Sequence, residues 1–268
     1  MVLPYDIQEA ADEANLAVVE AYLDEAGPGA VNETDEYGTT LLRSSLTNRI
    51  EERHVQFARR LIARGADVNI AGREGGAALH LACYPGDCAS AMVSLLLQAG
   101  ARVNVRSREG ETTPLGTLIK QFNYCLGPSW SMEGEEEAYD EAAHQRQVSR
   151  SGLDIMKLLL RAGASLDRCE RDLSAEAAMQ AFLSRHPSYA NDEYFTKCRE
   201  LVAGVRAHGS YKAYAREPHR KFLRLRSLLV RGRVKVRGRT KDSRRLERIA
   251  RLPNGACWHV LSFWREAG

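Results

Sequence analysis

The sequence predicts an all-α protein: a solenoid of helix-turn-helix repeats with β-turn fingers, followed by a helical C-terminal extension. A short phrase, Gly-Ala-x-(Val/Leu)-(Asn/Asp), recurs between residues 65 and 167. Apolar residues with the spacing of one helix face precede the copies of this phrase. Charge separates the extension from the repeats, because residues 212–268 hold 17 of the 38 Lys and Arg residues but only 4 of the 35 Asp and Glu residues. We therefore expect two regions with different roles.

Length and composition are those of a folded protein without membrane spans. The 268 residues are 44% hydrophobic and 27% charged, which is enough apolar material for a packed core. No apolar run reaches the length of a transmembrane helix, and residues 1–6 lack the basic and apolar parts of a signal peptide. The six cysteines show no framework spacing, so we expect free thiols and an intracellular location, cytoplasmic or nuclear.

The repeats follow one another in a fixed order. The full phrase occurs at residues 65–69, 100–104 and 163–167, and a shortened copy lies at 29–32. A glycine follows six residues after three of the copies, and a short Thr/Ala/Pro-Leu phrase comes next; these are Gly38 with 40–42, Gly75 with 77–80 and Gly110 with 113–115. Gly65 and Gly100 are 35 residues apart, whereas Gly100 and Gly163 are 63 apart. The third repeat therefore contains an insertion of about thirty residues.

This order resembles the ankyrin repeat family over roughly residues 7–180. Thr40 and Thr113 are expected to N-cap first helices, with Pro114 at the first helical position. Glycines 65, 100 and 163 are expected to end second helices. The expected apolar stripes of the second helices are Val18, Val19 and Leu23; Phe57, Leu61 and Ile62; Val93, Leu96 and Leu97; and Ile155, Leu158, Leu159 and Leu160.

The resemblance divides the chain into six parts. They are an N-terminal capping half repeat (1–32), two repeats (33–69 and 70–104), a repeat with an acidic insertion (105–167), a degenerate capping repeat (168–209) and the basic helical extension (210–268). Ala10–Val19 is predicted to belong to the second part of a repeat without a finger. The second helix of the degenerate repeat is predicted at about Asp192–Ala207.

The insertion lies at about 121–152, between the two helices of the third repeat. It contains Glu133–Glu137 and the aromatic residues Phe122, Tyr124, Trp130 and Tyr139. We interpret it as a solvated loop with a short helix. A docking loop and an acidic shield for the basic extension are the alternatives.

No catalytic motif accompanies the repeats. The sequence has no phosphate-binding loop, dinucleotide-binding fingerprint, nucleophile elbow or zinc-protease motif. His80, Cys83 and Cys88 lie close together but lack a fourth ligand at metal-site spacing. The resemblance implies instead that His80 hydrogen-bonds between neighbouring turns. We therefore expect no enzyme activity, no cofactor and no metal.

The resemblance implies a monomeric protein-binding module that holds a protein partner on a concave, finger-lined face. The contact residues that it implies are Tyr37, Thr39, Ser44, Arg73, Glu74, Leu81, Tyr84, Arg106, Arg108 and Glu109. Tyr37 and Tyr84 are the strongest candidates, because aromatic side chains supply rigid contact area at interfaces.

The end of the extension resembles the first helix of an F-box. The resemblance rests on Leu252, Pro253, Trp258, Val260, Leu261 and Trp264. It departs at Gly255, where the family has an acidic residue, and the later F-box helices are missing. It implies a substrate-recognition subunit that binds the adaptor of a cullin-type ubiquitin ligase. The alternative is that these apolar side chains pack on the preceding helices of the extension.

The basic part of the extension, residues 212–251, favours a third function. Its Lys and Arg residues would attract nucleic acid or an anionic membrane surface. The candidate anion-binding residues are Arg231, Arg233, Lys235, Arg237, Arg239 and Lys241. The alternatives are a nuclear localisation patch, a solvated tail on the acidic repeats and a calmodulin-type target helix. The last of these is suggested by the helix predicted at 220–230, where Phe222, Leu225 and Leu229 share one face.

Overall fold

The computed structural model describes residues 3–46, 50–108, 111–122 and 141–231. The chain divides into two compact units, Met1–Arg206 and Ala207–Gly268, and each is described by itself. The described residues form helices and isolated β-bridges but no strand. The predicted all-α class is confirmed.

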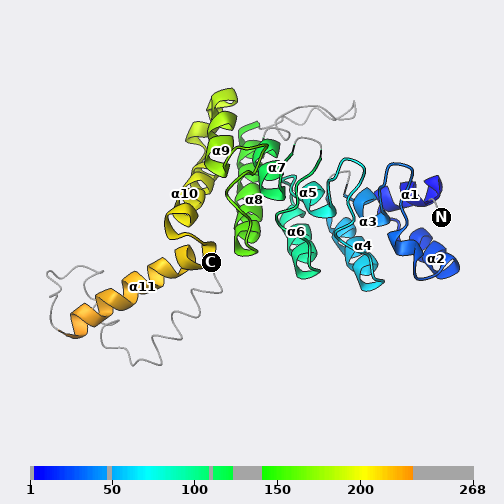
Figure 1. Cartoon of the computed structure of the whole chain (residues 1–268), viewed down its shortest axis with the longest axis horizontal. Helices are drawn as coiled ribbons and strands as arrows, with labels where there is room; N and C mark the ends of the chain where they lie inside the picture. Colours follow the sequence, from blue (N-terminus) through cyan, green and yellow to red (C-terminus); the bar gives the residue numbers. More distant parts are fainter. Residues whose placement is uncertain (1–2, 47–49, 109–110, 123–140, 232–268) are drawn as a thin grey trace. The chain divides into compact units, whose positions relative to one another are not determined.

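The first unit consists of helix pairs that stack in chain order (Figure 1). First helices pack on first helices, α1 on α3, α3 on α5, α5 on α7 and α7 on α9, and α4, α6 and α8 pack in a second row. The pairs are α1 (Tyr5–Asp12) with α2 (Leu16–Ala26), α3 (Leu41–Ser44) with α4 (Glu52–Ala63), α5 (Ala78–Ala82) with α6 (Ala89–Gln98), α7 (Pro114–Gln121) with α8 (Glu141–Arg161), and α9 (Ala175–Arg185) with α10 (Glu193–His208). Short 3₁₀ helices lie at Ala30–Asn32 and Pro187–Asn191.

The helix ends follow the predicted chemistry. The Thr40 hydroxyl accepts a hydrogen bond from the Arg43 amide at 3.3 Å, and the Thr113 hydroxyl accepts one from the Gly116 amide at 3.2 Å. Pro114 begins α7. The predicted C-terminal glycines of α4, α6 and α8 have φ of 92°, 87° and 93° at Gly65, Gly100 and Gly163, where a side chain would be strained.

An asparagine ladder joins one repeat to the next. The Asn69 side chain donates to the Gly100 carbonyl at 3.2 Å and accepts from the Arg102 amide at 2.8 Å. Equivalent pairs of bonds link Asn32 to Gly65 and Asp67, and Asn104 to Gly163 and Ser165. The recurring phrase thus contains both the glycine that ends a helix and the side chain that ties the next repeat to it.

The apolar stripes of the second helices form the core, with one correction. Most of the predicted positions are buried: Val19, Leu23, Phe57, Leu61, Val93, Leu96, Ile155, Leu159 and Leu160. Ile62, Leu97 and Leu158 are half-buried. Val18 is 43% exposed, so its predicted place in the stripe is wrong.

The N-terminal piece contains two helices rather than the second part of a repeat alone. Ala10–Val19, predicted to belong to the second part of a repeat without a finger, is split between α1 and α2, and Ala14 between them has φ of 55°. The Asn15 side chain accepts a hydrogen bond from the Val18 amide and caps α2. This cap, which the sequence reasoning missed, separates the two helices and lets α1 pack on α3.

Both edges of the predicted insertion belong to the folded repeats. Helix α8 begins at Glu141, well before Gly152. Phe122, predicted to lie in a solvated loop, is fully buried among the rings of Phe182, Tyr189 and Phe195. The Tyr189 hydroxyl donates to the Phe122 carbonyl at 2.7 Å. Residues 123–140, with Glu133–Glu137 and the remaining aromatic residues of the insertion, lie outside the described residues.

The degenerate repeat and the extension both contain their predicted helices. Helix α10 lies within a residue of the predicted range. In the second unit, α11 (Tyr211–Val230) includes the predicted helix at 220–230 and begins earlier. In the described part of the chain, no helix is long and apolar enough to cross a membrane.

Candidate binding surface

Four finger loops precede the first helices α3, α5, α7 and α9. We define them as residues 33–39, 70–76, 105–108 with 111–112, and 168–174. In the first finger, the Asp35 carboxylate accepts hydrogen bonds from the amides of Tyr37 at 2.8 Å and Thr39 at 2.6 Å. The turn ends at Gly38, with φ of 75°. The two hydrogen bonds to the Asp35 carboxylate and the left-handed conformation of Gly38 together fix the shape of this loop.

Backbone hydrogen bonds join the fingers into one edge. The amide of Arg73 donates to the Tyr37 carbonyl at 3.2 Å, that of Arg108 to Glu74 at 2.7 Å and that of Arg171 to Glu111 at 3.0 Å. Glycine permits this approach at two fingers. A Cβ on Gly38 would lie 3.2 Å from the Arg73 nitrogen, and one on Gly75 would lie 2.6 Å from the Arg108 nitrogen.

His80 adds a side-chain link between neighbouring repeats. Its Nδ1 accepts a hydrogen bond from the Ala77 amide at 3.2 Å, and its Nε2 lies 3.2 Å from the Thr112 carbonyl. The carbonyl can only accept, so Nε2 carries the proton. Burial lowers the His80 pKa and favours this neutral form. The predicted bridging role is confirmed, and both ring nitrogens are used by the backbone.

One repeat of the first unit matches a known repeat family. Residues 74–108 match the family model of the ankyrin repeat. The matched range runs from the second finger through α5 and α6 to the third finger. The fold of the first unit is an ankyrin-repeat solenoid, as the sequence predicted.

Arg43 lies in the first helix α3 at the position that His80 has in the next first helix, α5. It is buried, its Nη1 donates to the Gly38 carbonyl at 3.3 Å, and its guanidinium packs where a side chain on Gly72 would lie. Burial lowers the Arg43 pKa, while the charges of Glu74 and Asp35 oppose that shift. Arg43 was not among the predicted contact residues, although its position after Thr40-Leu41-Leu42 is the same as that of His80 after Ala77-Ala78-Leu79.

Most of the predicted contact residues reach the surface of the ankyrin fingers and first helices. Tyr37 is 63% exposed and Tyr84, after α5, is 41% exposed. Arg73, Glu74 and Arg108 are exposed, and Thr39, Leu81 and Arg106 are half-buried. The Glu36 carboxylate accepts a hydrogen bond from the Tyr37 hydroxyl, which raises the Tyr37 pKa and keeps that hydroxyl protonated.

One predicted contact residue is not available at the surface. Ser44 is only 1% exposed, because α1 packs on α3, the helix that carries it. The expectation that Ser44 is freed from packing is therefore wrong. Glu109 lies outside the described residues, as do the anion-binding candidates after Arg231 and all of the adaptor-binding candidates from Leu252 to Trp264. Arg231 follows α11 and is exposed.

Two finger residues were missed. Arg168 and Arg171 lie in the fourth finger, and both are exposed. The signal was present in the sequence, because Arg73-Glu74-Gly75, Arg108-Glu109-Gly110 and Arg171-Asp172-Leu173 are related tripeptides at matching places in successive repeats.

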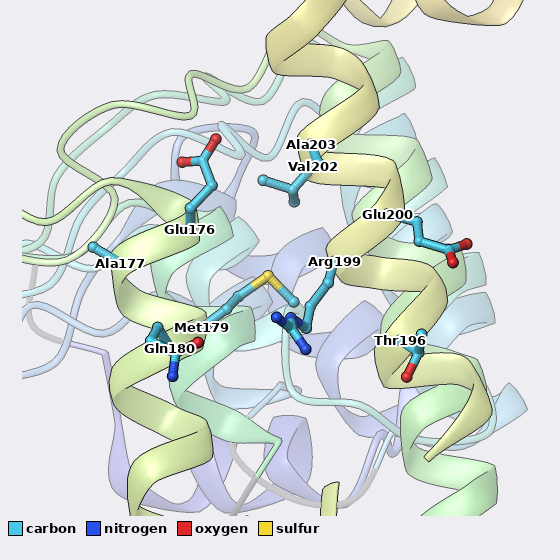
Figure 2. A pocket seen from close by; sticks show the side chains of 9 residues that line it. All are labelled: Glu176, Ala177, Met179, Gln180, Thr196, Arg199, Glu200, Val202 and Ala203. Carbon is cyan, nitrogen blue, oxygen red and sulfur yellow. The ribbon is translucent and has the colours of Figure 1, made fainter. Parts of the chain in front are cut away.

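A groove of about 620 Å³ lies between α9 and α10 (Figure 2). Its floor includes Met179 and Val202, which are buried, and its rim includes Glu176, Arg199 and Glu200. Glu176 is also bound by Arg206 at 2.8 Å, which lowers the Glu176 pKa to about 2. None of the predicted contact residues lines this groove, so it is not part of the candidate binding surface.

Proposed function

We propose that the protein is a non-catalytic binding module that holds a protein partner on the concave face lined by its ankyrin fingers and first helices. Ankyrin repeats generally mediate protein–protein interaction. The observation that carries the proposal is the exposure of two large aromatic side chains, Tyr37 and Tyr84, on a framework fixed by backbone hydrogen bonds. Rigid aromatic anchors lose little conformational entropy on binding, so they are favoured at the centres of interfaces.

The buried histidines support a binding role over a catalytic one. His80 bridges two repeats through both ring nitrogens. His54 accepts from the Glu51 amide at 3.1 Å through Nδ1 and bonds the Asp12 backbone with its other nitrogen. Each ring is committed to holding backbone segments together, which leaves it no free nitrogen for proton transfer to a substrate.

The test is quantitative affinity purification of the full chain from cells that make it. We compare the natural protein with a Tyr37→Ser, Tyr84→Ser variant and with a control, Val18→Ser, Arg59→Ser, whose side chains are exposed on second helices. The tyrosine variant should lose a bound protein at least about tenfold, since hot-spot aromatic residues contribute about 2 kcal/mol or more each. Equal recovery with all three proteins would contradict the proposal.

An exposed row of cations on α11 favours anion binding as a second function. Lys212, Arg216, Arg220 and Arg224 are exposed and four residues apart, about 6 Å along the helix. None of the four forms an ion pair with another residue in the described ranges. If the row binds phosphates, changing all four to Gln should lower affinity for a single-stranded oligonucleotide and flatten its salt dependence. Unchanged binding at every salt concentration would exclude this role for the row.

The adaptor-binding alternative stays a prediction from the sequence. A Leu261→Asp, Trp264→Ala variant of the full chain should lose a cullin-ligase adaptor that the natural protein retains. Because the contact is apolar, this loss should be insensitive to salt. Absence of the adaptor from the natural protein would remove the alternative.

A further inference from the structure

We infer that the second, third and fourth fingers carry an arginine ladder, Arg73, Arg108 and Arg171, that selects an acidic, extended segment of a protein partner. The inference rests on the proposed function and adds the chemical class of the partner. It concerns the finger edge alone, whereas Tyr84 lies beyond α5.

The three arginines occupy the same place in the sequence repeat, four residues after Asn69, Asn104 and Asp167, although Arg171 alone has a left-handed backbone, with φ of 51°. Each donates its backbone amide to a carbonyl of the preceding finger, at 3.2, 2.7 and 3.0 Å for Arg73, Arg108 and Arg171. Their backbone positions are therefore set by the finger-to-finger contact rather than by the arginine side chains. The hydrogen-bonded framework therefore fixes the order of the three residues along the edge.

The ladder guanidinium groups are available for a ligand. All three residues are exposed, and none has an ion pair with another residue in the ranges that the structure describes. Two nearby acidic groups have other partners: Asp172 pairs with Arg168 at 3.1 Å, and Glu111 lies 3.6 Å from Arg106. Glu74, the residue after Arg73, is exposed and is an acidic neighbour of the ladder with no ion pair in the described ranges.

Arg106 links the third finger to the fourth beside the ladder. Its Nη2 donates to the carbonyls of Arg171 at 2.5 Å and Glu111 at 3.2 Å, and it is half-buried. This side chain ties the third finger to the fourth, and its charge is offset by the Glu111 carboxylate at 3.6 Å. Arg106 therefore positions the backbone beside Arg171 and adds little net charge to the edge.

The spacing of the ladder favours one peptide conformation. Two backbone segments per finger, at the usual spacing of hydrogen-bonded segments, would place the backbones of successive arginines about 10 Å apart. A polyproline II segment rises about 3.1 Å per residue with three residues per turn, which places every third side chain on one face about 9 Å apart. A partner with Asp or Glu at every third position would therefore meet one guanidinium per carboxylate. Arginine suits this task, because its planar fork can bind a carboxylate through two hydrogen bonds.

The first finger gives the ladder a polarity. Glu36 follows Asp35 in the first finger as Arg73 follows Gly72 in the second, so the equivalent charge there is negative. The complementary segment has a basic residue opposite Glu36 and acidic residues opposite the three arginines. A nucleic acid strand, whose phosphates are uniformly negative, would meet repulsion at that end.

The test measures fluorescence anisotropy of labelled peptides with the full chain. The spaced peptide carries Lys-Pro-Pro-Glu-Pro-Pro-Glu-Pro-Pro-Glu, and the clustered peptide carries the same residues with the three Glu adjacent. We expect the natural protein to bind the spaced peptide about fivefold to tenfold more tightly, the amount that three exposed ion pairs can supply. The preference should weaken as salt rises.

Two variants separate the ladder from general charge. Arg73→Gln, Arg108→Gln, Arg171→Gln should abolish the preference, whereas a control with the same charge loss, Arg59→Gln, Arg102→Gln, Arg150→Gln, should keep it. The backbone amides that set the fingers remain in both variants, and circular dichroism checks that both are folded.

Three results would overturn the inference: no preference for spacing, a preference retained without the ladder, or tighter binding of an oligonucleotide of equal charge. Continued capture of a protein through Tyr37 and Tyr84 would show that the proposed function survives such a failure.

Discussion

Replacing Gly75 by alanine tests whether close finger contact contributes to stability. Gly75 has φ of 77°, and an added Cβ would lie 2.6 Å from the Arg108 nitrogen and 2.8 Å from its Cγ. Arg108 donates its amide to Glu74 at 2.7 Å, so relief of this clash must disturb that hydrogen bond. We therefore expect two costs: backbone strain at positive φ and weakened contact between the second and third fingers.

Gly100→Ala is a matched control, because it carries one of these costs without the other. Gly100 has φ of 87°, and an added Cβ meets nothing within 4 Å. Backbone strain should destabilise both variants by about 1–2 kcal/mol. Loss of the finger hydrogen bond should add about 0.5–1.5 kcal/mol to Gly75→Ala alone. The predicted difference between the two free energies of unfolding is thus about 1 kcal/mol.

Urea unfolding of the full chain, followed by far-ultraviolet circular dichroism, measures both free energies. Amide hydrogen exchange at Arg108 gives a local readout, and protection there should fall in Gly75→Ala but not in Gly100→Ala. Equal free energies of unfolding together with unchanged protection of the Arg108 amide would refute the reasoning. The close approach of the fingers would then be incidental to stability.

Three further changes test other parts of the structure. Tyr189→Phe removes the donor to the buried Phe122 carbonyl and should lower the free energy of unfolding by about 1–3 kcal/mol; a change near zero in urea unfolding would contradict that bond. Burial lowers the folded pKa of His80 below its ordinary value of 6.5, so the unfolded chain binds more protons there. Its stabilising contribution is present above about pH 6.5 and falls in more acidic solution, and His80→Asn should make unfolding less pH-dependent in that window. Arg206→Gln should move the Glu176 pKa up from about 2 in an NMR titration while changing stability by less than about 1 kcal/mol, because the pair is partly exposed.

The repeat architecture was predictable because the same local chemistry recurs with one period. Gly65 and Gly100 must end helices in a left-handed conformation, and Thr40 and Thr113 must begin them, whatever packs nearby. Such caps depend on a few adjacent residues, so the sequence alone identifies them.

The errors lie where burial depends on residues far away in the chain. Ser44 is buried by α1, a helix whose separation from α2 depends on the cap at Asn15. Phe122 sits beside a polar insertion in the sequence, yet Phe182 and Tyr189, some sixty residues later, enclose it. The residues that neighbour Ser44 and Phe122 in the sequence do not indicate such distant contacts.

The candidate surface was predictable in part. Tyr37 and Tyr84 were identified from their places in the repeat, and both are exposed. Arg171 was missed because the fourth repeat lacks the glycine that follows the arginine in the second and third repeats, although its place four residues after Asp167 matches theirs. Sequence comparison among the fingers could have found the Arg-Glu-Gly recurrence, but not its alignment along one edge.

Site-specific photo-crosslinking tests most directly whether the fingers and first helices hold a protein. A photoreactive phenylalanine analogue replaces Tyr37 or Tyr84 in the full chain, and in control proteins it replaces Val18 or Arg59 on second helices. The same partner should be crosslinked from both tyrosine positions and from neither control position. Crosslinks to that partner from Val18 and Arg59, with none from the tyrosine positions, would place binding on the opposite face and contradict the account.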